Sequence, residues 1–394
     1  MGAAGIGALV GTEAGLTGVG ARIVETIRIP TRPFGKTGDN VSILALGGDG
    51  TTSNRLMMNQ AVKWGVTFWD VWDSDRSLGG GISQKGVGGY FNRYPKDRKK
   101  IFLMTKTKDH EPDALTTFLN KSLLEMNTDS IDFFVIHSVS DIASLHPKTR
   151  NWVEIAKSDG KIRYFGVSSH SRMEAVMNAA ADAGWIDGVM VTYNYRNMYK
   201  ESMKKAVEKC RKAGLAIVSM KSQARSAFRF FGNAPKSAEK LTYSFINKGF
   251  SNAQAYLKAV WTNPDIASIT SMMLNMNQFT ANVAAALDKK KLSDTDMGLL
   301  EKYAHETRFQ YCTGCTQICE SVLDKKVPIG DVMRYMMYAR GYGDKIRAGA
   351  LYNSLPQQTR ADIIGLDYSQ AEKKCPQKLA IGKIMRSAAK KLAC

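Results

Sequence analysis

Four cysteines have the spacing of a metal centre. Cys312, Cys315 and Cys319 lie together in the stretch YCTGCTQICESV. Thiolates bind zinc and iron–sulfur clusters, and a closed site of either kind usually has four protein ligands. Cys375 supplies a fourth thiol, and the proline after it is typical of the last ligand of a ferredoxin-type cluster. The four cysteines therefore predict a [4Fe–4S] cluster.

Other uses of these thiols stay open at this point. A four-thiolate zinc site is one, although zinc motifs more often contain two Cys-x2-Cys pairs. Disulfide bonds are another if the protein is exported, but cysteines this close in sequence pair poorly among themselves. A radical-generating cluster would have the opposite spacing, Cys-x3-Cys-x2-Cys. Of the other two cysteines, Cys210 lies on an expected helix and suits a core position, and Cys394 is the last residue.

Three further polar residues stand at the ends of apolar runs. Asp70, Lys106 and His137 each close such a run. A lysine beside a carboxylate can hold or tune a proton donor, and an imidazole can polarise a carbonyl group. We therefore predict that these three form a catalytic site. The structural alternatives are a retained ion pair between Asp70 and Lys106 and a hydrogen-bonded core histidine at His137.

The elements that must position these residues follow a repeating pattern. Eight short apolar runs alternate with amphipathic stretches such as 113–127 and 199–214. Continuous apolar runs are typical of strands buried on both faces of a parallel sheet. The runs are 41–48, 66–71, 101–107, 131–138, 163–169, 188–194, 215–222 and 266–273. Eight strands alternating with helices predict an α/β fold, the (β/α)8 TIM barrel, whose chemistry lies at the carboxyl ends of its strands.

The chain divides into three parts. Residues 1–28 are rich in glycine and alanine, residues 29–295 form the expected barrel, and residues 296–394 form a small, mostly helical iron–sulfur domain. The first part is similar to the apolar portion of an export leader but has no Arg-Arg pair. We therefore slightly favour export to the periplasm, with a twin-arginine-like leader remnant, over a cytoplasmic location.

Composition narrows the classes of partner. The formal net charge is +19 and no run of apolar residues is long enough for a membrane span. There is no nucleic-acid-binding motif, so the charge indicates a solvated basic surface or an acidic protein partner. An oligomer is compatible with the sequence.

Several motifs resemble those of the aldo/keto reductases. The segments FWD, LMTK and FFVIH occur in the order and spacing of that family, and RPFGKTG (32–38) and GKIRYFGVSSH (160–170) are similar as well. The resemblance covers roughly residues 30–290. The part of the chain that follows resembles the ferredoxin-type extension found on one branch of the family.

This resemblance implies an activity and a set of catalytic residues. In the family an Asp, a Tyr, a Lys and a His reduce carbonyl groups with hydride from NADPH, and the Tyr donates the proton. The resemblance implies that Asp70, Lys106 and His137 stand at the positions of the family's Asp, Lys and His, but the position of the Tyr falls on Asp75 or Leu78. Neither residue is a phenol.

The expected cofactor contacts also depart from the family pattern. Ser168 and Ser169 stand where the family binds the nicotinamide amide, and Asn282 matches an adenine-side contact. Met190 replaces a Gln, and Met220 replaces an aromatic ring. The segment after the eighth strand has no Arg or Lys for a 2′-phosphate. These differences argue against NADP(H) binding.

We therefore expect an iron–sulfur oxidoreductase of the aldo/keto reductase type. Electrons would pass between the [4Fe–4S] cluster and a site at the barrel mouth or a redox partner protein. The positive net charge favours an acidic partner. One alternative is a non-catalytic electron-transfer or scaffold subunit with a degenerate barrel. A second is an NADPH-dependent carbonyl reductase in which another acid replaces the Tyr. The sequence identifies no substrate.

Overall fold

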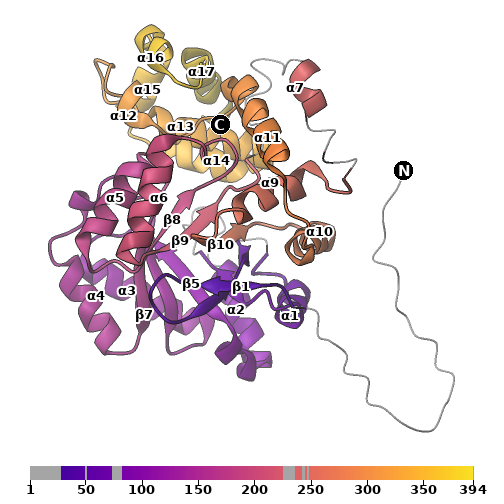
Figure 1. Cartoon of the computed structure of the whole chain (residues 1–394). Helices are drawn as coiled ribbons and strands as arrows, with labels where there is room; N and C mark the ends of the chain where they lie inside the picture. The colour runs from indigo at the N-terminus through magenta and orange to yellow at the C-terminus, as the bar shows by residue number, and fades with distance from the viewer. Residues whose placement is uncertain are drawn as a thin grey trace.

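Eight parallel strands form a closed barrel. The computed structural model describes residues 28–48, 51–72, 82–224, 236–241, 245 and 248–393. The barrel order is β10-β3-β4-β5-β6-β7-β8-β9, so consecutive strands pair and β10 closes the barrel against β3 (Figure 1). The strands are β3 (Leu44–Gly47), β4 (Phe68–Asp70), β5 (Phe102–Thr107), β6 (Ile131–Ile136), β7 (Ile162–Ser169), β8 (Gly188–Thr192), β9 (Ala216–Met220) and β10 (Ile266–Ser271). All eight predicted strands and the predicted fold class are confirmed.

The interior of the barrel is filled by side chains rather than open. Phe68, Met104, Phe133 and Val218 belong to one buried apolar cluster, together with Phe34 from outside the barrel strands. Phe34 follows strand β1 (Thr31–Pro33), which pairs antiparallel with β2 (Asn40–Ser42). The run 41–48 is therefore not one strand, because it contributes to this hairpin before it enters the barrel at β3. Its first part serves to close the barrel at one end.

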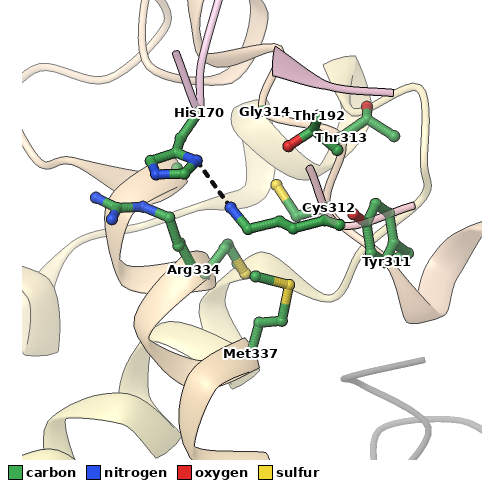
Figure 2. Close-up of a pocket in the computed structure, with 11 residues that line it drawn as sticks. His170, Thr192, Tyr311, Cys312, Thr313, Gly314, Arg334 and Met337 are labelled. Carbon is green, nitrogen blue, oxygen red and sulfur yellow. Dashed lines mark hydrogen bonds between the residues drawn. The ribbon is translucent and has the colours of Figure 1, made fainter. Parts of the chain in front are cut away.

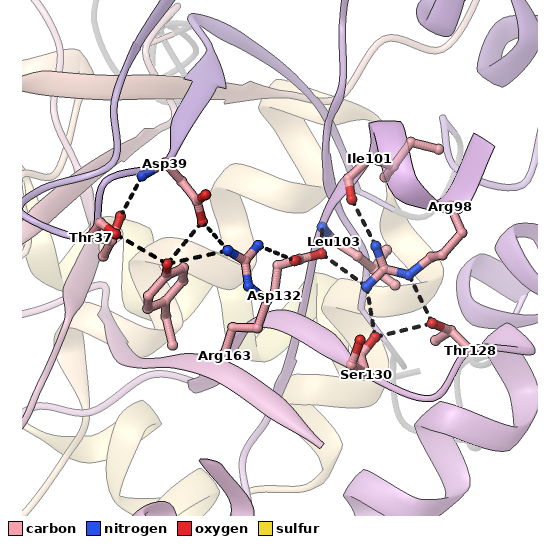
Figure 3. Close-up of polar contacts among 10 residues, drawn as sticks. Thr37, Asp39, Arg98, Ile101, Leu103, Thr128, Ser130, Asp132 and Arg163 are labelled. Atoms are coloured by element: carbon pink, nitrogen blue, oxygen red, sulfur yellow. Dashed lines mark hydrogen bonds and ion pairs between the residues drawn. The ribbon is translucent and has the colours of Figure 1, made fainter. Parts of the chain in front are cut away.

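A network of charged residues lies at the amino ends of the strands. Asp132 accepts hydrogen bonds from the Leu103 N–H at 2.8 Å and from Arg163 Nη1 at 2.8 Å (Figure 3). Arg98 Nη2 lies 3.0 Å from the same carboxylate, and Arg163 also pairs with Asp39 at 2.6 Å. These contacts tie three strands to the hairpin. Polar residues at this end of a barrel usually stabilise the fold rather than catalyse.

Helices surround the barrel in the order that the sequence predicts. The helix expected over 199–214 ends where Gly214 adopts a left-handed conformation, φ 78°. The helices are α1 (Arg55–Lys63), α2 (Ile82–Arg93), α3 (Pro112–Met126), α4 (Thr149–Ser158), α5 (Met173–Ala183), α6 (Glu201–Ala213), α7 (Lys236–Leu241), α9 (Asn252–Trp261), α10 (Met276–Leu287) and α11 (Asp294–Glu306). The domain boundary expected after residue 295 falls in the first turn of α11.

The rest of the chain is helical. Figure 1 shows these helices gathered at one end of the barrel. They are α12 (Thr316–Cys319), α13 (Ile329–Met337), a π-helical turn (Tyr338–Tyr342), α14 (Lys345–Asn353), α15 (Gln357–Gly365), α16 (Ser369–Lys374) and α17 (Ile381–Leu392). Helix α17 places Ile381, Ile384, Met385, Ala388 and Leu392 in the core, which is the spacing of one helix face. We refer to residues 307–393 as the helical cap.

The cap contacts the carboxyl ends of the strands. The Arg172 N–H after β7 donates to the Gly314 carbonyl at 3.0 Å, and Lys200 before α6 donates to Thr313 Oγ1 at 3.1 Å. Gly314 has φ 75°, and a Cβ atom there would overlap the His170 carbonyl oxygen. A glycine is therefore required where the cysteine loop meets the barrel.

Some expectations fall on residues that the structure does not describe. Asp75 and Leu78, at the position of the family Tyr, and residues 1–27 lie outside the described residues. Within the described part of the chain, no helix has the length and apolar character to span a bilayer.

Candidate active site and metal centre

Asp70 and Lys106 form a buried ion pair on adjacent strands. Lys106 Nζ donates to Asp70 Oδ1 and, at 3.3 Å, to the Val71 carbonyl. The other carboxylate oxygen of Asp70 accepts from Thr270 Oγ1 at 2.8 Å. The side chains of Lys106 and Asp70 are only 6% and 4% exposed. The structure therefore brings together two of the three predicted catalytic residues, as a paired and hydrogen-bonded unit.

His137 follows β6 and is also buried. Its Nδ1 lies 2.6 Å from Ser168 Oγ, and the Ser138 N–H donates to the same hydroxyl at 3.2 Å. The Trp72 ring contacts its imidazole with centroids 5.1 Å apart. Burial, together with Lys106 and other cations, holds the pKa of His137 well below its usual range. His137 is therefore neutral near pH 7.

A chain of hydrogen bonds leads from His137 to a lysine. His170 Nε2 lies 3.4 Å from His137 Nε2, and Lys221 Nζ lies 2.8 Å from His170 Nδ1. An ammonium group can only donate, so Nδ1 of His170 accepts and its Nε2 carries the proton. That proton points at Nε2 of His137, whose Nδ1–H then donates to Ser168. The contacts thus fix one consistent tautomer for each ring.

Side chains from the cap surround this relay. The Arg347 guanidinium stacks on the Trp72 ring at 4.2 Å and on the Tyr338 ring at 4.8 Å. Arg334 Nη1 lies 3.5 Å from the Tyr338 hydroxyl. Burial alone raises the pKa of Tyr338, but Lys221, Arg334 and Arg347 together lower it to about 7. Tyr338 lies at the start of the π-helical turn, a feature that often marks functional sites.

A pocket lies between the strand ends and the cap (Figure 2). We call it the mouth pocket. Its volume is about 400 Å³, including the part open to solvent. It is lined by His170, Thr192, Lys221, Tyr311, Cys312, Thr313, Gly314, Gly330, Met333, Arg334 and Met337. The Tyr311 hydroxyl accepts from Asn194 Nδ2 at 3.4 Å, which joins the cysteine loop to the residues after β8.

The three predicted cofactor contacts have partners within the protein. The Ser168 hydroxyl is hydrogen-bonded to His137 Nδ1, and Ser169 Oγ donates to the Ser171 carbonyl at 2.6 Å. Asn282 on α10 donates to Ser271 Oγ at 3.1 Å and accepts from Gln223 Nε2 at 3.2 Å. Ser168 and Ser169 lie near the relay, whereas Asn282 belongs to a separate polar cluster. Their role in cofactor binding stays a prediction.

The four predicted metal ligands line one pocket. We call it the cysteine pocket. Cys312 and Cys315 lie in the loop before α12, Cys319 ends α12, and Cys375 follows α16. These segments are separated in sequence, but all four residues line the same apolar pocket, together with Pro376. Its volume, including space open to solvent, is about 340 Å³.

Burial favours the protonated form of three of these thiols, those of Cys312, Cys315 and Cys319. It raises the pKa of Cys312 to about 12 and raises the pKa values of Cys315 and Cys319 as well. Within the described residues, no three His, Cys, Asp or Glu side chains are close enough together to hold a single metal ion. Thiolate ligands must lose their protons to bind a metal, so binding at this pocket would release protons.

Sequence reasoning missed several residues of the mouth pocket. Lys221 directly follows β9, so the rule that identified Asp70 and Lys106 at strand ends would also have found it. Arg334 and Tyr338 are one helical turn apart on the cap, but that spacing alone does not distinguish a site from a helix face. His170 directly follows β7, so the same rule would have found it.

Comparisons with known proteins agree with the architecture. The profile of the aldo/keto reductase family matches residues 50–304. The holo form of an aldo-keto reductase from Bacillus halodurans superposes with a TM-score of 0.57 and 20% identity, covering 70% of this chain and 96% of that one. All four predicted metal ligands lie beyond residue 304 and hence outside the family match.

Two curated relatives match half of the chain or slightly less. The aldo-keto reductase yakc of Schizosaccharomyces pombe, whose name specifies NADP(+), is 28% identical over 212 residues, which is 48% of this chain and 60% of that protein. An aldo-keto reductase of Fusarium vanettenii is 23% identical over 241 residues, which is 50% of this chain and 64% of that protein. Each match therefore spans less than two thirds of the relative. The closed barrel agrees with this fold. The family profile covers most of the chain, and it establishes that this protein belongs to the aldo/keto reductase family.

Proposed function

We propose that this protein is an iron–sulfur oxidoreductase built on an aldo/keto reductase barrel. Cys312, Cys315, Cys319 and Cys375 would hold a [4Fe–4S] cluster that exchanges electrons with a molecule bound at the barrel mouth. The observation that carries the proposal is that the cysteine pocket and the mouth pocket adjoin. They share Cys312, Thr313, Gly330 and Met333.

The chemistry of the cysteine pocket suits a cluster better than a single ion. Zinc in a four-thiolate site lies about 2.3 Å from every sulfur, so its ligands must be tightly grouped. In a [4Fe–4S] cluster each thiolate binds a different iron, so the four sulfurs stand farther apart. The Cys375–Pro376 pair lines this pocket, and a proline after the last cysteine is typical of the second arrangement.

A cluster would supply one-electron chemistry, and the barrel residues would manage protons and charge. Lys221 and the two neutral imidazoles form a hydrogen-bonded path along which a proton can be held or moved. Asp70 and Lys106 hold a fixed, paired charge at the strand ends. Such a path supports reactions in which a proton follows an electron to a bound molecule.

Metal analysis of cysteine variants tests this proposal. Protein purified without oxygen should contain about four irons and four inorganic sulfides per chain. Cys375→Ser should lose most of the iron and destabilise the cap, because the binding energy of a metal is also folding energy. Cys210→Ser is the matched control, since Cys210 is buried on α6 and donates only to the Met177 carbonyl. Stoichiometric zinc without iron would refute the proposal.

A second candidate is NADPH-dependent carbonyl reduction. It is favoured by the family and by the NADP(+) in the name of the yeast relative. Against it stand the internal hydrogen bonds of Ser168, Ser169 and Asn282 and the absence of Arg and Lys from residues 272–282. A 2′-phosphate left without a cation loses several kcal/mol of binding free energy.

Calorimetry with NADPH decides between the two. The iron–sulfur proposal predicts weak or no binding, and no turnover of simple aldehydes. Micromolar NADPH binding, with aldehyde reduction abolished in Lys106→Met, would favour the carbonyl reductase instead. The same titration with the metal-loaded protein and with Cys375→Ser separates effects of the cap from effects of the barrel.

A further inference from the structure

The mouth pocket contains two cations without a carboxylate among its lining residues. Lys221 and Arg334 line it, and no Asp or Glu lines it in the described part of the chain. The Lys221 ammonium has one neutral acceptor, His170 Nδ1, at 2.8 Å. Burial lowers the pKa of Lys221 to about 8, because the ammonium group loses contact with water in this site.

The protein provides hydrogen-bond partners for only some of the donors of the Arg334 guanidinium group. Its side chain is 10% exposed, and its Nη2 pairs with Asp331 Oδ1 at 2.6 Å. The Asp331 side chain is 45% exposed and does not line the pocket. The Nε atom of Arg334 is buried and has no hydrogen-bond partner. An unpaired buried donor on a charged group is costly, so Arg334 has hydrogen-bonding capacity that the protein itself does not use.

We infer that the mouth pocket binds a small organic carboxylate between Lys221 and Arg334. A planar carboxylate matches the hydrogen-bonding geometry of a guanidinium group, and the lysine adds a second charge-assisted bond. Asp331 offsets one of the two positive charges, so the pocket suits a singly charged anion better than a phosphate dianion. The hydroxyl groups of Thr192, Tyr311 and Thr313 can bind the polar remainder of the ligand.

The assignment of this carboxylate as a substrate rests on the proposed function, whereas its binding does not. Cys312 lines the same pocket, so a molecule held there would lie beside a proposed cluster ligand. The rival explanation is that a group of the protein itself, rather than a ligand, balances the charge of Lys221 and Arg334. The Tyr338 ring faces Lys221 at 5.9 Å and Arg334 at 5.9 Å, and its phenolate would neutralise part of their charge.

Calorimetry with the full-length protein tests the inference. Pyruvate is the probe, pyruvamide is its neutral counterpart, and inorganic phosphate tests whether any anion suffices. We expect pyruvate to bind, and pyruvamide and phosphate to bind at least tenfold more weakly. Lys221→Met and Arg334→Gln should each weaken pyruvate binding about tenfold or more, the effect of losing one hydrogen bond to a charged group.

Two further variants act as controls. Lys209→Met removes a positive charge whose partner is Asp182 on the surface, and it should bind pyruvate as the parent does. Arg334→Lys keeps the charge but loses the planar geometry, so it provides a second test if Arg334→Gln does not fold. Equal affinity for pyruvate and pyruvamide, or no pyruvate binding in either the parent or Tyr338→Phe, would overturn the inference. Iron content measured on the same samples separates this result from failure of the proposed function.

Discussion

Replacement of Lys106 by Met would leave the Asp70 carboxylate without its cation at the strand ends. Both side chains are almost completely buried, so the surface value of 0–1 kcal/mol for an ion pair does not apply. Removing one partner of a buried pair typically destabilises a protein by about 3–5 kcal/mol. Asp70 would keep its hydrogen bond from Thr270, so we expect the lower end of this range, about 3 kcal/mol.

A double-mutant cycle separates the pair from its surroundings. Asp70→Asn keeps the shape and can still hydrogen-bond to Lys106 and Thr270, but it removes the negative charge that neutralises Lys106, so it should also lose about 3 kcal/mol. The double variant Asp70→Asn/Lys106→Met has no buried charge and should be less destabilised than the sum by about 2–3 kcal/mol. Urea denaturation followed by tryptophan fluorescence measures each free energy of unfolding.

The surface pair of Lys209 and Asp182 is the matched control for this cycle. These side chains are 42% and 66% exposed, so Lys209→Met should change the free energy of unfolding by less than about 1 kcal/mol. Additive losses in the Asp70/Lys106 cycle, or a loss below about 1 kcal/mol for Lys106→Met, would refute our reasoning that this pair is buried and mutually dependent.

Three other predictions concern the cap and the closed end of the barrel. The pKa of Tyr338 falls from about 10 in the unfolded chain to about 7 in the fold, so its contribution to stability should be present above pH 10 and disappear as the pH falls through 7. The free energies of unfolding of the parent and of Tyr338→Phe should therefore differ by an amount that grows with pH across this range. A difference that stays constant with pH would contradict this prediction. Gly314→Ala should displace the cysteine loop and lower the iron content, whereas Gly343→Ala, at φ 78° with open space around it, should only add backbone strain of about 1–2 kcal/mol. Asp132→Ala should lower the free energy of unfolding by about 3 kcal/mol through loss of its three partners, yet pyruvate affinity should not change because this network lies at the opposite end of the barrel.

The barrel was predictable because its strands carry a strong local signal. Segments such as IDFFVI at β6 are buried at every position, so they appear in the sequence as unbroken apolar runs. The ends of such runs identify residues at the barrel mouth, which is why Asp70 and Lys106 could be placed together. The β1–β2 hairpin was missed, because three-residue strands carry too little periodicity to stand out.

The cap residues of the site could not be predicted in the same way. Arg347 reaches Trp72 across more than half of the chain, and nothing in either local sequence signals that contact. Cap helices lie outside the family match, so the resemblance could not place Arg334 or Tyr338 either. The cysteines were the exception in one respect, because their residue type and spacing predicted that they share one pocket. Their role as metal ligands stays a prediction.

Electron paramagnetic resonance of the reduced protein tests the central claim most directly. The protein would be purified without oxygen, reduced by one electron per chain, and measured with and without pyruvate. We predict the spin signal of a reduced [4Fe–4S] cluster, with a line shape that changes when pyruvate fills the pocket beside Cys312. A protein that contains iron but whose signal pyruvate leaves unchanged would contradict the link between the two pockets, and a protein with no iron and no signal would contradict the cluster itself.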